Sequence, residues 1–207
     1  MAVIDIARMG HPVLRRRADE IADPTAPEIH ALVADMIETM RAAGGVGLAA
    51  PQIKVSRRVV IFTVPEGRGG GDPEDTAQPL MALINPVIEP LTEETKLSWE
   101  GCLSLPGLRG AVARPRRIRY RGLTLEGQSF ERVVTGFHAT VVQHECDHLD
   151  GILYPQRMTD MSLFGYKEEW DDTFREIQAR AENQDSAESQ LAAEAERFNR
   201  MKATVGG

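Results

Sequence analysis

The stretch Gln143-His144-Glu145-Cys146-Asp147-His148 decides the fold, because it contains the His-Glu-x-x-His spacing of a helical metal site. Residues four positions apart on a helix lie one turn apart on the same face, so both imidazoles can reach one metal ion. Phe137 and Val141 lie earlier on this face. We therefore predict a helix that begins near Gly136 and carries the chemistry.

The residues inside this motif differ in the direction that each faces. Glu145 lies about 100° around the helix from His144, which places it to act as a general base rather than as a ligand. Cys146 lies about 200° from His144 and is predicted to be a small buried hydrophobe. Asp147 and Asp150 could orient a histidine, but the interpretation we prefer is that they pair with arginines.

A catalytic site of this kind needs a third protein ligand. The longer pattern HExxHxxGxxH fails, because Tyr154 stands where that pattern requires histidine. No His or Cys follows His148, so a downstream ligand would have to be an acidic residue such as Glu168 or Glu169. Upstream, Cys102 lies in Glu-Gly-Cys-Leu-Ser, residues 100–104, where glycine permits a tight turn. Cys102 is the stronger candidate.

The rest of the chain predicts an α+β fold: short, mostly antiparallel strands packed around the central HExxH helix, with an N-terminal helix and a C-terminal helical tail. Thr25 and Glu28 have capping-box spacing and open a helix with an apolar face, which ends at Gly44 and Gly45. A surface loop is expected over residues 66–78. Strands are expected at residues 57–63, 80–87, 95–99, 117–125 and 129–134.

The domain organisation follows from the position of these patterns. Residues 1–165 are predicted to form the catalytic metallohydrolase domain. Residues 166–207 are predicted to form a helical, partly disordered extension, because an apolar stripe that includes Tyr166 and Trp170 is followed by the polar run at residues 183–190.

Composition excludes several classes of protein. The 207 residues include 42% hydrophobic ones but no apolar run long enough to cross a bilayer, so no membrane contact is expected. A net charge of −7 argues against a nucleic-acid substrate. The first residues do not resemble a secretory signal, which predicts a bacterial cytosolic protein, although a processed organellar protein would look the same.

Three segments together resemble a known family. They are Gly-Val-Gly-Leu-Ala-Ala-Pro-Gln at residues 45–52, Glu-Gly-Cys-Leu-Ser at 100–104, and the helical motif at 143–148. In this order they are similar to the three signature motifs of the polypeptide deformylases. The resemblance runs from about Met9 to Arg157 and implies nothing about the residues beyond roughly Trp170.

The resemblance implies metal-dependent removal of the N-formyl group from the N-terminal methionine of new proteins, with release of formate. It implies one divalent metal ion, natively Fe²⁺ with Zn²⁺ as the alternative, bound by Cys102, His144 and His148. Glu145 is implied to be the base. The side-chain amide of Gln52 and the backbone N–H of Leu103 are implied to form the oxyanion hole.

Substrate contacts can also be expected. The backbone of Gly45, Val46 and Gly47 is implied to bind an extended peptide, as an added strand does. Phe137 and Val141 should form an apolar wall for the methionine side chain, beside the metal ligands. Arg109 matches a family position near the peptide. The partners are nascent N-formylmethionyl polypeptides, and contact with the ribosome near the exit tunnel is a weaker inference from function. His11, His30 and His138 have no partner spacing and are predicted to be structural.

Two other functions are compatible with parts of this pattern. An HExxH endopeptidase that uses Glu168 or Glu169 as its third ligand would cleave internal peptide bonds. A metal-binding or peptide-binding module with lost activity could keep the same scaffold, but the presence of Cys102, Glu145 and Gln52 argues against it.

Overall fold

A computed structural model describes residues 2–67 and 72–169. The chain divides into two units, Met1–Gly165 and Tyr166–Gly207, and only residues 166–169 of the second are described. The helical extension predicted for residues 166–207 therefore lies almost wholly outside the described residues. In the part of the chain that is described, no helix is long and apolar enough to cross a membrane.

The described residues form two α-helices and eight β-strands, and the strand pairs between neighbours in the chain are antiparallel. The helices are α1 (Pro27–Ala42) and α2 (Gly136–Leu149). The strands are β1 (Gly47–Ala49), β2 (Val59–Val64), β3 (Gln78–Pro90), β4 (Thr95–Cys102), β5 (Leu105–Pro115), β6 (Arg117–Leu123), β7 (Ser129–Thr135) and β8 (Phe164–Tyr166). Short 3-10 helices are η1 (Pro12–Arg15), η2 (Ala50–Ile53), η3 (Tyr154–Arg157), η4 (Met161–Leu163) and η5 (Lys167–Glu169). The predicted fold class is confirmed.

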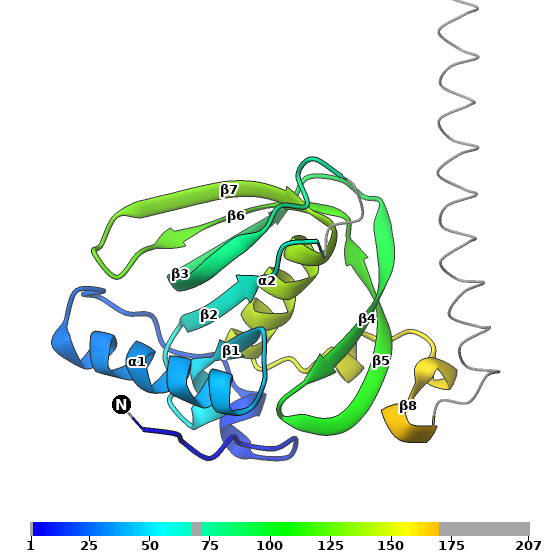
Figure 1. The fold of residues 1–207 in the computed structure, drawn as a ribbon, viewed down its shortest axis with the longest axis horizontal. Helices are drawn as coiled ribbons and strands as arrows, with labels where there is room; N and C mark the ends of the chain where they lie inside the picture. The colour runs from blue at the N-terminus through cyan, green and yellow to red at the C-terminus, as the bar shows by residue number, and fades with distance from the viewer. Residues whose placement is uncertain (1, 68–71, 170–207) are drawn as a thin grey trace, which may run out of the picture. The chain divides into compact units, whose positions relative to one another are not determined.

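The strands form two sheets. One has five strands in the order β1-β2-β3-β6-β7, so that β1 lies at its edge, and the other has the order β4-β5-β8. Figure 1 shows α2 between the five-stranded sheet and the hairpin of β4 and β5, with α1 beside β1 and β2. The helix that carries the HExxH motif is thus central.

Alternation along β2 explains how the two helices cover opposite faces of the five-stranded sheet. Val60 and Phe62 belong to the apolar cluster that contains the α2 residues Val142 and Cys146. Ile61, between them, belongs to the cluster formed with the buried face of α1. Successive side chains of a strand point to opposite faces, so β2 is buried on both sides.

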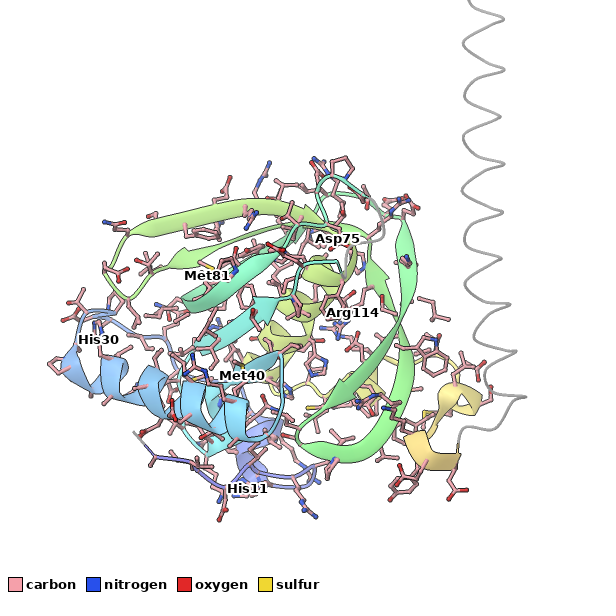
Figure 2. The ribbon with its side chains drawn as sticks, in the orientation of Figure 1. His11, His30, Met40, Asp75, Met81 and Arg114 are labelled. Atoms are coloured by element: carbon pink, nitrogen blue, oxygen red, sulfur yellow. The ribbon has the colours of Figure 1, made fainter. Side chains whose placement is uncertain are left out.

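Burial of α2 is complete along most of its length, because every residue from His138 to Leu149 is buried. Its polar side chains therefore need internal partners. The His138 ring has Tyr120 Oη at 3.1 Å on Nε2 and the Thr76 carbonyl at 2.9 Å on Nδ1, which gives it a structural role. His11 caps η1 by accepting from Val13 N, and His30 is exposed on α1 (Figure 2).

Several local predictions were wrong. Thr25 does not cap α1: the cap position is Ala26, Pro27 opens the helix, and Thr25 instead donates to the Asp23 carboxylate. Strand β5 was not predicted, because its two prolines and two glycines are more typical of a loop than of a strand. β3 continues to Pro90 rather than ending at residue 87.

The N-terminus of α2 is capped by a residue distant in sequence. Thr135, at the cap position, makes no side-chain cap, whereas the Asp75 carboxylate accepts from Phe137 N at 3.0 Å and from His138 N at 3.1 Å (Figure 2). Gly136 has φ +58°, and a Cβ there would collide with Asp75. The segment between β2 and β3 therefore anchors the helix that carries the HExxH motif.

Asp75→Ala should lower the free energy of unfolding by about 0.5–2 kcal/mol, because two N–H groups at the helix start lose their acceptor. Asp75→Asn should recover part of this loss, since its amide oxygen still accepts one bond. Urea unfolding measures the free energy of unfolding of both variants. The control is Glu93→Ala, at an exposed position, whose free energy of unfolding should stay within about 0.5 kcal/mol of that of the parent. A loss for Glu93→Ala as large as that for Asp75→Ala would contradict the cap.

Candidate active site

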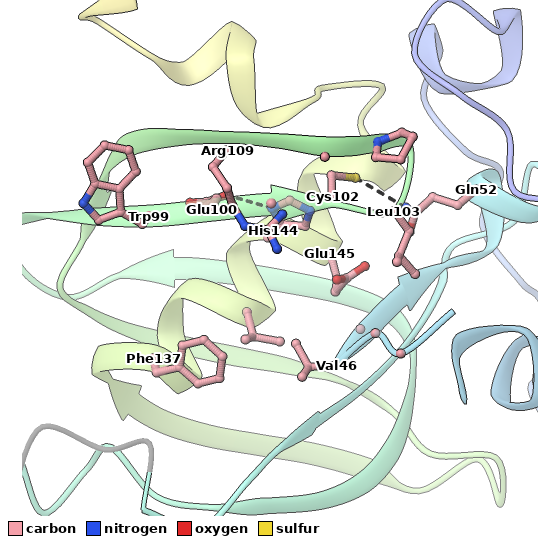
Figure 3. Close-up of a pocket in the computed structure, with 17 residues that line it drawn as sticks. Val46, Gln52, Trp99, Glu100, Cys102, Leu103, Arg109, Phe137, His144 and Glu145 are labelled. Carbon is pink, nitrogen blue, oxygen red and sulfur yellow. Dashed lines mark hydrogen bonds and ion pairs between the residues drawn. The ribbon is translucent and has the colours of Figure 1, made fainter. Parts of the chain in front are cut away.

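A pocket of about 490 Å³ lies where β1, the β4–β5 hairpin and α2 meet (Figure 3). The three sequence motifs thus converge, although they are far apart in the chain. Every predicted site residue except His148 lines this pocket: Gly45, Val46, Gly47, Gln52, Cys102, Leu103, Arg109, Phe137, Val141, His144 and Glu145. His148 is buried just behind it, against Cys102.

Cys102, His144 and His148 form a group that can hold a metal ion, with their ligand atoms all within 4.8 Å of one another. Cys102 Sγ lies 3.3 Å from His148 Nε2. Tetrahedral ligands of one zinc-like ion are roughly 3.3–3.6 Å apart, so the spacing fits. A thiolate with two imidazoles suits Fe²⁺ or Zn²⁺ and disfavours Mg²⁺ and Ca²⁺, which prefer oxygen ligands.

The electrostatics of this group favour a thiolate. Burial opposes ionisation of Cys102, but the His148 charge and hydrogen bonds from His144 and His148 outweigh it, so the pKa of the Cys102 thiol lies well below its ordinary value. Cys146 is the contrasting case: burial raises the pKa of its thiol, and it packs among apolar residues of the five-stranded sheet. Only Cys102 has the environment of a metal ligand.

Glu100 orients His144. Its Oε2 lies 2.7 Å from His144 Nδ1, and both of its oxygens accept from Arg114, at 2.7 and 2.9 Å. Burial opposes ionisation of Glu100, yet the bonds from Arg114 and His144 lower its pKa to about 2. Because the carboxylate is ionised, Nδ1 of His144 donates to it, which leaves Nε2 free for a metal.

Arg114 extends this contact into a buried chain of charges. Its Nη1 donates to Asp147, which also accepts from Arg157. Asp147 is therefore held by arginines, as the sequence suggested, and Asp150 likewise pairs with Arg58 at 2.7 Å. Because the folded-state pKa of Glu100 lies below its ordinary 4.5, the stability from its ionisation is present above about pH 4.5 and is lost as the pH falls toward 2.

Glu145 points into the pocket beside Gly47 (Figure 3). Its Oε2 is buried and has no hydrogen-bond partner among the described residues. Burial raises its pKa to about 7, partly offset by the nearby histidines. A Cβ on Gly47 would collide with this carboxylate, so glycine is required where β1 passes Glu145. A buried carboxylate near neutrality is suited to proton transfer.

The Gln52 side chain is fixed in orientation. Its Oε1 accepts from Ala49 N at 2.9 Å, so that its Nε2 faces Cys102 Sγ at 3.5 Å and Ser104 Oγ at 3.2 Å. Leu103 and Ser104 form the two-residue turn between the paired residues Cys102 and Leu105. The Gln52 amide and the backbone N–H of Ser104, which donates to Cys102 Sγ at 3.4 Å, thus both lie beside the thiolate.

The reason for Gly101 differs from the one predicted. It does not adopt the left-handed conformation of a tight turn; instead, the guanidinium of Arg109 lies across it, in space that a Cβ would occupy unless the Arg109 side chain moved. Arg109 donates to the Leu108 carbonyl and lines the pocket, half-buried, without a carboxylate partner among residues 2–67 and 72–169. Its charge therefore faces the pocket space.

Sequence reasoning missed three residues at this site. Trp99 lines the pocket together with Phe137 and Val141, and Tyr154 stacks on His144 with ring centroids 6.1 Å apart. Glu100 was quoted as part of a motif but was given no role. Its position two residues before Cys102 was the available signal, because ligand histidines usually donate to a carboxylate.

The comparisons with known proteins agree with this geometry. The model of the polypeptide deformylase family matches residues 3–163. The chain belongs to the polypeptide deformylase family. It is 53% identical over 161 residues to peptide deformylase 1 of Nitrosomonas europaea, covering 78% of this chain and 90% of that one. It is 54% identical over 163 residues to peptide deformylase 1 of Bordetella pertussis, covering 79% and 92%.

A solved structure is similar as well. The crystal structure of class I type b peptide deformylase from Acinetobacter baumannii with Met-Ala-Ser bound superposes with a TM-score of 0.68 at 36% identity, covering 76% of this chain and 99% of that one. The family is metal-dependent, and the chain is accordingly a hydrolase acting on the N-formyl amide of formylmethionine. Family membership sets aside the endopeptidase and the inactive module.

Arg114→Ala should lower the free energy of unfolding by about 3–5 kcal/mol, because the Glu100 and Asp147 carboxylates remain buried without their shared cation. The matched control is Arg116→Ala, which breaks an exposed pair with Glu94 and should cost at most about 1 kcal/mol. Thermal and urea unfolding compare the two proteins. An equal loss of unfolding free energy in the two variants would show that the buried pair contributes no more to stability than the exposed pair.

Proposed function

We propose that the chain removes the N-formyl group from the N-terminal methionine of new polypeptides by means of a divalent metal ion that Cys102, His144 and His148 hold. The observation that supports this is the convergence of the three ligand atoms within 4.8 Å. We propose Fe²⁺ as the native ion, with Zn²⁺ as the alternative that the same donor set accepts. The ion would act as a Lewis acid that activates water and polarises the formyl oxygen.

Glu145 is proposed to move the proton. Its unpartnered oxygen and its pKa of about 7 support a role in taking a proton from water and returning it to the departing nitrogen. One carboxylate would then serve as base and as acid, and formate and a free amine would be released.

Gln52 and the Leu103 N–H are proposed to hold the developing negative charge on the formyl oxygen. The fixed amide of Gln52, whose Nε2 faces the thiolate of Cys102, supports this role. Preoriented N–H donors stabilise an oxyanion without reorganising during the reaction.

The peptide is proposed to add to the free edge of β1, with its backbone along Gly45, Val46 and Gly47. The position of β1 at the sheet edge and at the pocket wall supports this arrangement. Phe137 and Val141 would contact the methionine side chain, and the Arg109 cation would face the peptide carbonyls. Met-Ala-Ser bound to the Acinetobacter baumannii enzyme is a peptide of the matching kind.

The cellular setting is also a proposal. Formylated N-termini arise during translation, so we place the enzyme in the bacterial cytosol, acting on chains that emerge from the ribosome. A net charge of −7 gives no support to direct binding of nucleic acid. The residues 166–207 are proposed to form an extension separate from the catalytic domain.

Formyl-Met peptides should be hydrolysed at least 10²-fold faster than acetyl-Met peptides, because an added methyl group must fit between the ligand residues and the wall at Gly45–Gly47. Steady-state assays with formyl-Met-Ala-Ser and acetyl-Met-Ala-Ser measure the ratio. Comparable rates would contradict the proposed function.

Three substitutions, at Cys102, Glu145 and Cys146, should differ in their effects on metal binding and turnover. Cys102→Ala should lose metal and activity together, because two histidines alone hold a divalent ion weakly. Glu145→Gln should keep the metal and lose roughly 10²–10⁴ in turnover, since no ligand is touched and the base is gone. Metal analysis beside turnover measures both effects.

Cys146→Ser is the matched control for the cysteine substitution. It should keep metal and most activity and lose about 1–3 kcal/mol of stability, because its hydroxyl would be buried among apolar side chains. Loss of metal in Cys146→Ser with retention in Cys102→Ala would overturn the ligand assignment.

A further inference from the structure

A second hollow, which we call the N-terminal groove, adjoins the pocket. Its volume is about 570 Å³, and it lies between the N-terminal segment, residues 3–8, and the end of α1. Figure 1 shows this segment running beside α1, and Ile4 N donates to Thr39 Oγ1 at 3.0 Å. The groove shares Leu103 and Pro106 with the pocket, so the two hollows have a common wall.

Backbone continuity also joins the two hollows. Gly44 and Gly45 line the pocket, and the residues directly before them, Ala42 and Ala43, line the groove. A substrate that leaves the pocket along this edge therefore enters the groove.

The direction of the substrate follows from the position of the reacting end. Glu145 lies against Gly47, so the formyl group belongs at that end of the edge. The rest of the peptide must then run from Gly47 toward Gly45, antiparallel to this chain. Antiparallel strands pair residue by residue, so three substrate residues match Gly45–Gly47. The extended backbone of this chain ends at Gly44, which has φ +66°, so the fourth substrate residue leaves the strand edge there, beside Ala43 and the end of α1.

We propose that the N-terminal groove binds apolar side chains at positions four to six of the formylated polypeptide, an inference that rests on the proposed function. Seven of the ten residues that line it have apolar side chains: Val3, Ile4, Ile6, Ala42, Ala43, Leu103 and Pro106. Val3 is 66% exposed and has surface to offer a ligand. Asp5 and Arg8 carry opposite charges in the same wall, so the groove has no net charge with which to select a charged segment.

The test compares three formyl peptides: formyl-Met-Ala-Ser, a hexapeptide that continues it with Leu-Leu-Leu, and one that continues it with Ser-Ser-Ser. The leucine hexapeptide should have a kcat/KM roughly five- to tenfold above that of the serine hexapeptide, the effect of partly burying an apolar side chain. The leucine hexapeptide should have a lower KM and an unchanged kcat, because a contact far from the formyl group stabilises the bound substrate and the transition state equally.

Ala42→Trp places a large side chain in the groove from the exposed last residue of α1 and should bring the ratio of the two hexapeptides to about one. The matched control is Ala31→Trp, on the same helix, exposed and outside the groove, which should keep the ratio of the parent. Val3→Asp is a second groove variant should Ala42→Trp fail to fold, and it should also lower the ratio.

The outcomes distinguish failure of the groove proposal from failure of the proposed function. The groove proposal is overturned if the parent has equal kcat/KM for both hexapeptides, or if the preference for leucine survives both Ala42→Trp and Val3→Asp. In either case, deformylation of formyl-Met-Ala-Ser would still support the proposed function. Failure of all three peptides to react with the metal-loaded parent overturns the proposed function itself.

Discussion

One carboxylate connects the two halves of the site. Glu100, on β4, contacts His144, on α2, and receives Arg114 from β5, which itself reaches Asp147 on α2. These buried charges fix the hairpin against the helix, because displacing either would strand an unpaired charge in the interior. Cys102 follows Glu100 by two residues on the same hairpin, so this contact also sets where the thiolate meets the histidines.

Burial of α2 between two layers explains why one helix can have such different faces. The side toward the five-stranded sheet is apolar and includes Val142, Cys146 and Leu149. The side toward the hairpin holds the histidines and the charges that pair with them. The side chains on both sides are buried from His138 to Leu149, which strengthens the hydrogen bonds and ion pairs among them. A helix on the surface would offer neither the dry wall nor the fixed ligands.

The sequence was sufficient where the information is local. Helical spacing brought His144 and His148 to one face, and the fold class followed from strand and helix patterns. It was insufficient where contacts cross the fold: the cap on α2 comes from Asp75, 62 residues before Phe137. β5 was hidden by prolines and glycines that its pairing with β4 accommodates. Cys102 was named as a candidate ligand from its motif, but no local pattern indicated that Glu100 pairs with Arg114.

The free edge of β1 has a consequence for what the enzyme can meet. An edge strand on an open surface can pair with any other sheet and so invites aggregation. Here the edge forms one wall of a pocket of about 490 Å³, which the β4–β5 hairpin and α2 also line. If the peptide adds to this edge as proposed, the site would select unfolded chain ends. A protein whose first residues have already folded would then be out of reach, so deformylation and folding would compete in time for the same N-terminus.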